Sequence, residues 1–372
     1  MKKKLVIFHP AIAPYRIDFF NSLHRAFDVS FYFEHENPLE QNFNQEIINS
    51  QIEFSYSYLK PGLFGIKNLR WDVFKILRKE KPHIIFISEY TILGLLVLLY
   101  KYLFNPKAKI VITCDDNLSM VVSARWIKRI TRFVLLKTAD LVLVVNDLVK
   151  SWYERNCFSK ATFFYFPIIQ SDTIFRTKLQ NAFPLTENLY SDYKIAGKKV
   201  LLYVGRLAPV KNIPFLIDVF EQLYVEQKDI VLFLVGDGPE RTYLEEKIQQ
   251  SEAKQSIYLV GKKEGIDLMA YYNLADLFVL PSTYEPFGTV VNEALLAGCY
   301  TLCSSVAGAA CLIKEAENGD VFDPYNVKEL TYKLDEYLSK IEPLKQISLK
   351  PNRMDKEYSV YMKDLLTKLN TL

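Results

Sequence analysis

Short apolar runs alternate with amphipathic segments along the whole chain of 372 residues. This alternation is typical of parallel βαβ units, in which crossover helices join buried strands. The expected strands are 5–8, 29–33, 84–87, 110–113 and 141–145, followed by 200–204, 230–235, 257–260, 277–280 and 301–304. The expected helices are 15–27, 69–80, 91–104, 121–137 and 147–156, followed by 213–227, 240–250, 265–273 and 289–297. The pattern predicts an α/β protein with two Rossmann-like parallel-sheet domains.

Charge is distributed unevenly between the two halves of the chain. Residues 1–200 contain 28 Lys and Arg against 18 Asp and Glu, whereas the remainder contains 18 against 25. The mixed, polar stretch 181–199 lies between the two strand series, and we interpret it as a linker. We therefore expect a boundary at residues 190/191 and two domains with different partners.

Cysteine and histidine usage argues against several kinds of site. The five Cys are odd in number and never spaced CxxC, and the four His form no HxH or HExxH pair. These features favour a reducing compartment, and they argue against a disulfide framework or a zinc site. No DxD triplet occurs, so no metal is expected, and we expect no nucleic-acid partner.

No stretch of the sequence is expected to span a membrane. The first apolar run is too short for a signal-peptide core, and the most apolar stretch, 92–104, is shorter than the ~20 residues that a spanning helix needs. The expected location is the cytoplasm.

The stretch 280–298 carries the clearest chemical pattern. A strand-like run ends before a loop that contains Glu285 and Pro286, and a helix-like segment with Glu293 follows. Pro286 prevents one continuous helix through both glutamates, because it lacks an N–H and clashes with the preceding turn. The helix start near Gly288 and Thr289 offers unpaired amides and a positive dipole end, which bind phosphate. A carboxylate on either side of an anion site suits a nucleotide sugar.

Three motifs in this half resemble those of a known family. Glu285-Pro-Phe-Gly288 with Glu293, the segment 205–211 (GRLAPVK) and the segment 235–239 (VGDGP) are similar to the donor-site motifs of retaining family-four glycosyltransferases of the GT-B fold, of the bacterial cell-surface glycan type. The resemblance implies two Rossmann-like domains facing across a cleft. It implies an acceptor side in 1–190, a nucleotide-sugar donor domain in 191–354, and a C-terminal helix, about 355–372, that packs back on the first domain.

The donor-side residues follow from these motifs. Arg206 and Lys211 follow one strand, where fixed cations would stabilise a departing diphosphate, although two solvated surface cations are the alternative. By resemblance, Glu293 holds the ribose hydroxyls, and Glu285 with the 287–289 backbone holds the sugar and its phosphate. The predicted catalytic residues are Glu285, Arg206, Lys211 and Asp115, and the predicted donor-binding residues are Glu293, Phe287, Gly288, Thr289, Gly205, Gly236 and Gly261. The 236–241 segment also resembles the GxGxxG motif of dinucleotide sites. The third glycine of that motif is missing here, so we expect a tight turn beside the donor instead.

The acceptor side is less defined. Asp115 stands where many relatives carry the histidine of a Thr-x-His motif, so it either accepts or orients the acceptor proton or caps a helix. Arg16 either meets an acceptor phosphate or is a surface charge. Tyr15 and Glu89 are further acceptor-side candidates, since Tyr15 adjoins Arg16 and Glu89 directly follows an expected strand.

The resemblance implies a retaining glycosyltransferase that needs no cofactor. It would move a sugar from a UDP- or GDP-sugar to a hydroxyl of a glycan or of a polyprenyl-diphosphate-linked acceptor, in cell-surface polysaccharide assembly. A sugar-nucleotide epimerase of the same fold and a non-catalytic glycosyltransferase-like subunit are the alternatives.

The expected helix 121–137 suggests contact with a membrane. Its basic residues fall on one arc and its apolar residues on a neighbouring arc, the sets being Arg125, Lys128, Arg129 and Arg132, and Trp126, Ile127, Ile130, Phe133 and Val134. Such a helix suits peripheral contact with an anionic membrane at the inner face of the cell membrane. The alternative is that the apolar arc packs on the first sheet.

Overall fold

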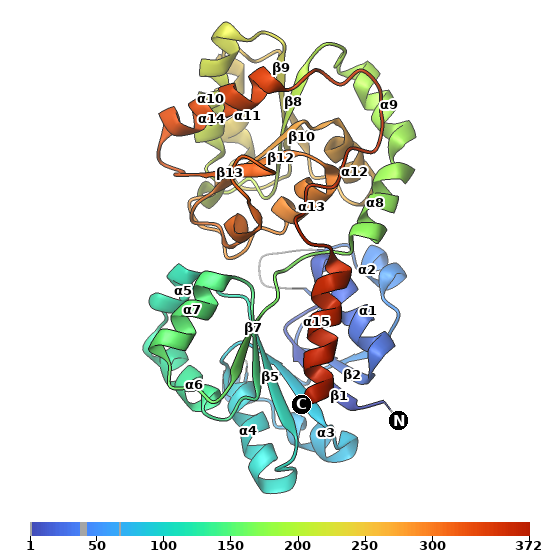
Figure 1. The fold of residues 1–372 in the computed structure, drawn as a ribbon, viewed down its shortest axis with the longest axis vertical. Coiled ribbons are helices and arrows are strands. Elements are labelled where there is room, and N and C mark those ends of the chain that lie inside the picture. Colours follow the sequence, from blue (N-terminus) through green and yellow to red (C-terminus); the bar gives the residue numbers. More distant parts are fainter. Residues whose placement is uncertain (1, 38–42, 67) are drawn as a thin grey trace. The chain divides into compact units, whose positions relative to one another are not determined.

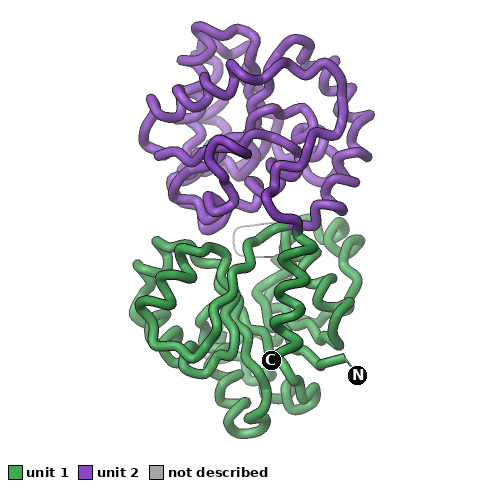
Figure 2. The backbone as a smooth tube through the Cα atoms, in the orientation of Figure 1, with its two compact units in different colours: residues 1–169, 358–372 green, residues 170–357 purple. Residues whose placement is uncertain are grey.

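The computed structural model describes residues 2–37, 43–66 and 68–372, and the chain forms two compact units. Unit 1 comprises residues 1–169 and 358–372, and unit 2 comprises residues 170–357 (Figure 2). Each unit contains one parallel β-sheet with helices on both faces (Figure 1). The predicted fold class, two Rossmann-like parallel-sheet domains, is confirmed.

The sheet of unit 1 has the strand order β3-β2-β1-β4-β5-β6-β7, and every pair is parallel. Its strands are β1 (Lys4–His9), β2 (Asp28–Phe33), β3 (Tyr56–Tyr58), β4 (Ile84–Ser88), β5 (Lys109–Cys114), β6 (Leu141–Val144) and β7 (Thr162–Tyr165). Its helices are η1 (Pro14–Arg16), α1 (Ile17–Ala26), α2 (Gln45–Gln51), η2 (Leu63–Gly65), α3 (Asp72–Glu80), α4 (Ile92–Phe104), α5 (Leu118–Val122), α6 (Trp126–Leu136), α7 (Asp147–Asn156) and α15 (Tyr358–Thr371).

Both faces of this sheet are covered, which explains why its central strands are almost wholly apolar. Helices α3, α4, α6 and α7 share one buried cluster with alternate strand residues. The opposite face carries α1, whose Phe20 packs against Phe31 of β2, and α15, which packs against α1. The Ser22 and Tyr358 hydroxyls lie 3.0 Å apart between these two helices. The C-terminal helix therefore belongs to unit 1.

The sheet of unit 2 has the order β10-β9-β8-β11-β12-β13 and is also parallel throughout. Its strands are β8 (Lys199–Val204), β9 (Ile230–Val235), β10 (Ile257–Gly261), β11 (Leu277–Leu280), β12 (Tyr300–Ser304) and β13 (Gly319–Phe322). Its helices are α8 (Asp172–Asn181), α9 (Phe183–Asp192), η3 (Pro209–Lys211), α10 (Ile213–Glu226), α11 (Arg241–Gln250), α12 (Gly265–Leu274), α13 (Val290–Ala297), η4 (Gly308–Leu312) and α14 (Val327–Lys340). Helices α10, α11 and α14 share a buried cluster with one face of the sheet, and α8, α9, α12 and α13 pack against one another.

The strand order of each sheet reverses at one point. In unit 1 the first strand, β1, lies between β2 and β4, and in unit 2 the first strand, β8, lies between β9 and β11. Crossovers leave this point in opposite directions, so the loops at the carboxyl ends of the two strands diverge and leave room for a ligand. We therefore expect ligands at the carboxyl ends of β1 and β4 in unit 1, and of β8 and β11 in unit 2.

The division between the units lies earlier than the sequence suggested. The predicted boundary at residues 190/191 falls inside α9, and the stretch 181–199, interpreted as a linker, is mostly this helix. Asn273 of α12 fixes α8 and α9 to unit 2, because its Nδ2 donates to Leu179 O at 2.8 Å and to Thr186 Oγ1 at 3.1 Å. Thr186 is the only fully buried residue of α9, so the segment lacks the apolar periodicity that predicts a helix.

The other differences concern edge strands, one broken helix, and three helices that were not predicted, α2, α8 and α14. Strands β3, β7 and β13 were not predicted; each is short and pairs on one side only, so it needs no continuous apolar run. The expected helix 121–137 is two helices, α5 and α6. Arg132 Nη1 donates at 3.0 Å to Val121 O, a carbonyl in the last turn of α5.

Among the described residues, no helix is both long and apolar enough to cross a membrane.

Candidate active site

The carboxyl edge of unit 2 is built on close approaches between backbone segments. Gly205 N donates to Val235 O, and Gly236 N donates to Gly261 O, both at 3.0 Å. Gly236 has a φ of +153°, and a Cβ atom there would lie 1.8 Å from Gly205 O. A side chain at residue 236 would therefore force the β8 and β9 loops apart. Three glycines predicted to bind the donor, Gly205, Gly236 and Gly261, thus come together.

The loops after β8 and β11 are joined at the point where the strand order reverses. Lys211 forms an ion pair with Glu285, and both side chains are largely buried. Beside this pair, Thr283 N donates to Val210 O at 2.9 Å. Arg206 lies on the same β8 loop with its side chain exposed, and Tyr203 Oη donates to its carbonyl at 3.0 Å. Lys211 and Glu285 therefore meet at this edge, and Arg206 lies in the same loop after β8. Their roles in donor binding remain predictions.

The loop that leads into α13 is fixed by its backbone. Phe287 is buried, its carbonyl accepts from Ala309 N at 2.7 Å, and Glu285 O accepts from Gly308 N at 3.3 Å. Gly288 has a φ of +95°, which favours glycine. Thr289 occupies the N-cap position of α13, and its side chain makes no cap hydrogen bond. Val291 N donates to Gly288 O at 3.0 Å, and the N-terminus of α13 presents the positive end of the helix dipole, which favours an anionic ligand.

Glu293 is held by two residues that sequence reasoning missed. Its Oε1 accepts from Gln170 Nε2 at 2.8 Å, and its Oε2 accepts from Tyr272 Oη at 2.9 Å. Burial raises the pKa of Glu293, and these two hydrogen bonds offset part of that rise. Asn292 Oδ1 accepts from Gln170 N at 2.9 Å and so positions Gln170. No motif surrounds Gln170 or Tyr272, so the sequence carried no signal for either.

At the carboxyl edge of unit 1, Arg16 forms an ion pair with Asp115. The Arg16 side chain is only 4% exposed, so the interpretation as a surface charge is wrong. The cap of α5 is Asn117, whose Oδ1 accepts from Met120 N at 3.0 Å, so Asp115 is not the cap of this helix. Tyr15 lies in η1 beside Arg16, half-buried, with its ring against that of Phe43. The role of Asp115 in proton transfer remains a prediction.

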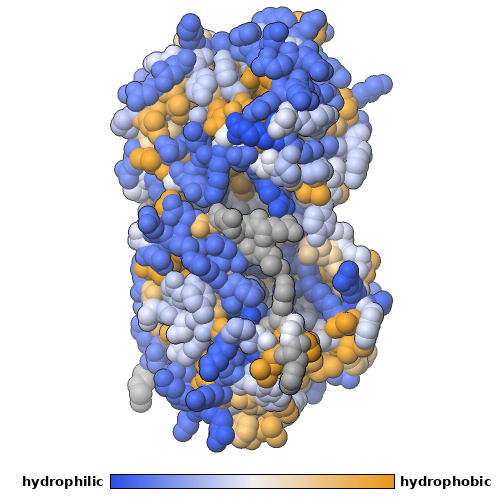
Figure 3. All heavy atoms as spheres, turned by 180° about the vertical axis from the view of Figure 1, so that it is seen from behind, coloured by the Kyte–Doolittle hydropathy of each residue, from blue (hydrophilic) through white to orange (hydrophobic). Residues whose placement is uncertain are grey.

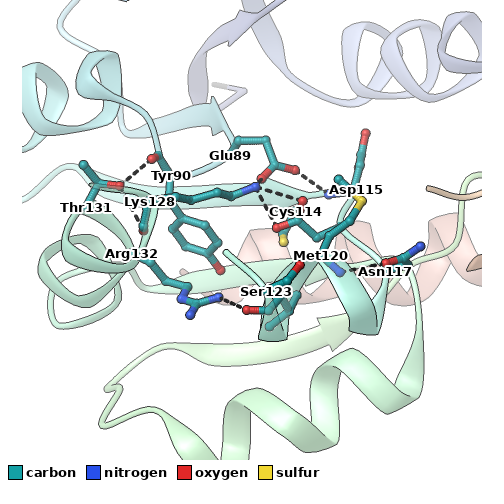
Figure 4. Close-up of polar contacts among 12 residues, drawn as sticks. Glu89, Tyr90, Cys114, Asp115, Asn117, Met120, Ser123, Lys128, Thr131 and Arg132 are labelled. Atoms are coloured by element: carbon teal, nitrogen blue, oxygen red, sulfur yellow. Dashed lines mark hydrogen bonds and ion pairs between the residues drawn. The ribbon is translucent and has the colours of Figure 1, made fainter. Parts of the chain in front are cut away.

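Glu89 follows β4 and lies at the centre of a network (Figure 4). Its Oε1 accepts from Asp115 N at 2.7 Å, and its Oε2 lies 2.9 Å from Lys128 Nζ of α6. Lys128 Nζ also contacts Asp116 Oδ2 at 2.7 Å. Burial raises the pKa of Glu89 to about 7, Asp116 adds to the rise, and Lys128 opposes it. Glu89 adopts a φ of +60°, a strained conformation for a residue other than glycine.

This network contains the one group of three metal-ligand residues found among the described residues, Glu89, Cys114 and Asp116, with ligand atoms within 4.8 Å of one another. The Lys128 ammonium already lies between the two carboxylates and supplies the positive charge that a cation would bring. Burial raises the pKa of the Cys114 thiol well above its usual range, which disfavours the thiolate form that binds metals. We interpret the cluster as an ion-pair network.

Helix α6 differs from the prediction in both of its faces. Lys128 points to the Glu89 network, and Arg132 is buried with its guanidinium carbon 5.1 Å from the Trp152 ring centre. Neither therefore belongs to an exposed basic face. The alternative, that the apolar arc packs on the sheet, is also wrong, because every member of that arc is exposed, namely Trp126, Ile127, Ile130, Phe133 and Val134.

Comparison with known proteins gives a family match in the C-terminal half of the sequence and several similar proteins. The family model described as "Glycosyl transferases group 1" matches residues 187–350. An uncharacterized glycosyltransferase of Methanocaldococcus jannaschii is 36% identical over 142 residues, 38% of this chain and 36% of that protein. A GDP-mannose-dependent alpha-mannosyltransferase of Corynebacterium glutamicum is 34% identical over 133 residues, 36% of this chain and 30% of that protein. The chain thus spans about a third of the length of these two relatives.

The likeness to solved structures extends over the whole chain. The Anabaena protein HepE, solved in complex with UDP, superposes with a TM-score of 0.75 at 17% sequence identity, and the alignment covers 100% of both chains. The two proteins share a fold, while the family match over residues 187–350 lies within unit 2.

Proposed function

Residues 187–350 place the chain among the group 1 glycosyltransferases of the GT-B fold, and from this premise we propose that it transfers a sugar from a nucleotide-diphospho-sugar to an acceptor hydroxyl with retention of configuration. One observation carries the proposal. Lys211, after β8, and Glu285, after β11, form an ion pair where the strand order of unit 2 reverses, and Arg206 and the start of α13 lie in the loops that follow the same two strands. This is the place where open parallel sheets bind ligands.

The proposed donor subsite assigns one task to each group. The α13 amides and the two cations, Arg206 and Lys211, face the diphosphate, whose negative charge grows as the sugar leaves. Glu285, fixed by Lys211, meets the transferred sugar. Glu293, held by Tyr272 and Gln170, accepts hydrogen bonds from the ribose hydroxyls. Fixed cations supply the charge stabilisation, so we propose a reaction without a metal or a dissociable cofactor.

The proposed reaction is a front-face substitution. The bond between the anomeric carbon and the phosphate oxygen breaks as the bond to the acceptor oxygen forms on the same face. The acceptor proton passes to the departing phosphate oxygen. In this scheme Arg16, Asp115 and the Glu89 network orient the acceptor, which agrees with their place at the carboxyl edge of unit 1.

The donor and acceptor are proposed as classes. HepE was solved with UDP, and the Corynebacterium relative is named for GDP-mannose, which supports a UDP- or GDP-sugar. We propose a glycan or a polyprenyl-diphosphate-linked glycan as the acceptor, used in the cytoplasm during cell-surface polysaccharide assembly.

The test begins with the nucleotide. Thermal shift against UDP, GDP, ADP and CDP should show one preferred diphosphate, and the corresponding sugar nucleotides then enter a transfer assay with glycan acceptors. Retention predicts that NMR of the product shows the anomeric configuration of the donor, with turnover unchanged in EDTA. An isomerised donor without any acceptor would identify an epimerase. Nucleotide binding without turnover across donors and acceptors would favour a binding subunit.

A further inference from the structure

The outward face of α6 is apolar. We call Trp126, Ile127, Ile130, Phe133 and Val134 the α6 outer surface; Trp126 is 70% exposed, and Ile127, Ile130 and Phe133 are each more than 50% exposed. Single exposed apolar residues are ordinary, but five on three turns of one helix mark an interaction surface.

The opposite face of α6 is fixed to unit 1, so the outer surface does not result from a loosely packed helix. Thr131 Oγ1 donates to Tyr90 O at 2.6 Å, and Leu135 packs against Gly94 of α4, where an added Cβ would lie 2.9 Å from the Leu135 side chain. Lys128 reaches the Glu89 network from this inward face (Figure 4). The inner side of the helix is therefore packed against unit 1, whereas its apolar outer side is exposed.

The neighbouring helix α4 adds to the same part of the unit. It packs against α6, and its exposed side chains include Leu99, Tyr102, Leu103 and Phe104. Seen from behind, unit 1 carries hydrophobic atoms towards its lower end (Figure 3). Exposed apolar side chains therefore occur on both of these packed helices.

The charge of this region selects the partner. From Asn117 to Ala139 the sequence contains five Lys or Arg and no Asp or Glu, and α4 contains a lysine but no acid. Three of these cations, Arg125, Arg129 and Lys137, are exposed, and Lys137 Nζ lies 4.1 Å from the Phe133 ring centre. Exposed aromatic and aliphatic side chains with cations at their margin match the interface of an anionic bilayer.

We propose that unit 1 docks on an anionic membrane leaflet through the α6 outer surface, with Arg125, Arg129 and Lys137 contacting lipid phosphates. Lys128, on the inward face of the same helix, contacts Glu89 and Asp116, so docking brings the acceptor-side network close to the headgroups. A lipid-linked acceptor would then be met at the membrane surface. Only this last point rests on the proposed function.

The test is sedimentation with lipid vesicles, in the absence of any donor or acceptor. The wild-type protein should sediment with vesicles that contain phosphatidylglycerol at low salt, and it should leave them at high salt or with pure phosphatidylcholine. In the variant Arg125→Gln/Arg129→Gln/Lys137→Gln, the partition coefficient should fall about fivefold for each cation removed. In Trp126→Ser/Ile130→Ser it should fall at least tenfold.

A matched control is Tyr332→Ser, because Tyr332 of α14 in unit 2 is 69% exposed, close to the 70% of Trp126. It should bind vesicles as the wild type does, and the circular dichroism of all variants should match. Wild-type protein that stays in the supernatant at low salt, or unchanged binding in both multiple variants, would overturn the proposal. Self-association that Trp126→Ser/Ile130→Ser abolishes would instead assign the surface to a second copy of the chain. Because no turnover is measured, failure here leaves the proposed transfer reaction untouched.

Discussion

The carboxyl edges of the two sheets occupy equivalent places, yet they are built differently. Of the 13 glycines in the sequence, ten lie in unit 2, including Gly205, Gly236, Gly261 and Gly288 at its carboxyl edge. Of the three glycines of unit 1, two lie in the connection from β3 to α3 and one lies in α4, whereas the segments after β1 and β4 carry charged side chains such as Arg16 and Glu89. Unit 2 brings backbones together, whereas unit 1 brings side chains together.

This difference matches the two proposed ligand classes. Backbone amides and a helix N-terminus bind a diphosphate, which is common to all nucleotide-sugar donors. Side chains contributed by several elements can instead be adapted to one acceptor. Close approaches between backbone segments require particular residues at fixed spacing. This requirement explains why the family match lies in unit 2.

The largest expected effect tests the charge at the edge of unit 2. Arg206→Ala should lower kcat by about 10²–10³-fold, because a cation that stabilises the departing diphosphate is lost. Its exposed side chain makes a large change in stability unexpected. Lys254→Ala is the control, since Lys254 is an exposed cation just before β10, at the other end of the sheet. Equal turnover in both variants would contradict the donor-side assignment.

The next effect tests the backbone construction of unit 2. Gly236→Ala should destabilise unit 2 by about 2–3 kcal/mol, because the Cβ would lie 1.8 Å from Gly205 O. Gly197→Ala isolates the cost of the backbone conformation, since Gly197 has a φ of +74° and no atom within 4 Å of the added Cβ. It should cost about 1 kcal/mol. Chemical denaturation followed by circular dichroism would measure both, and equal losses would mean that the close approach is not required.

A smaller effect concerns Glu293. Tyr272→Phe removes a hydrogen bond that lowers the Glu293 pKa, so that pKa should rise further. Donor KM should increase about tenfold with little change in kcat. Donor binding needs the ionised carboxylate, so binding should be lost at a higher pH on acidification than in the wild type. Tyr271→Phe, one residue earlier on α12, is the control, and an identical pH profile in Tyr272→Phe and wild type would exclude Tyr272 as a positioning residue.

The smallest effect tests the side-chain construction of unit 1. Folded Glu89 has a pKa of about 7, above its unfolded value, so unfolding releases a proton between about pH 4.5 and 7. Stability should therefore fall as pH rises through this window, and Glu89→Gln should remove about 1–2 kcal/mol of that fall. Hydrogen exchange of unit 1 peptides measures the change. Glu46→Gln, on the exposed side of α2, should keep the wild-type change of unit 1 stability with pH. If Glu89→Gln shows the same change with pH as Glu46→Gln, the proposed effect of the Glu89 network is contradicted.

The sequence by itself determined the parts of the molecule that depend on local order. Buried parallel strands such as β4 and β9 need unbroken apolar runs, so their positions are close to those predicted. The grouping of Gly205 with Gly236 and of Lys211 with Glu285 at the carboxyl edge of unit 2 was also predictable, because these residues lie in loops whose shape depends on the residues nearby. The order of these motifs along the chain was enough to suggest the resemblance that the family match over residues 187–350 supports.

Only the tertiary structure decided which distant side chains meet. Nothing in the sequence links Lys128 to Glu89, or Gln170 and Tyr272 to Glu293, because each pair joins separate elements whose packing sets the distance. The exposure of the α6 outer surface was decided in the same way. Helical periodicity divides a helix into faces, but the neighbouring elements determine which face is buried, and here the basic Lys128 and Arg132 turned inward.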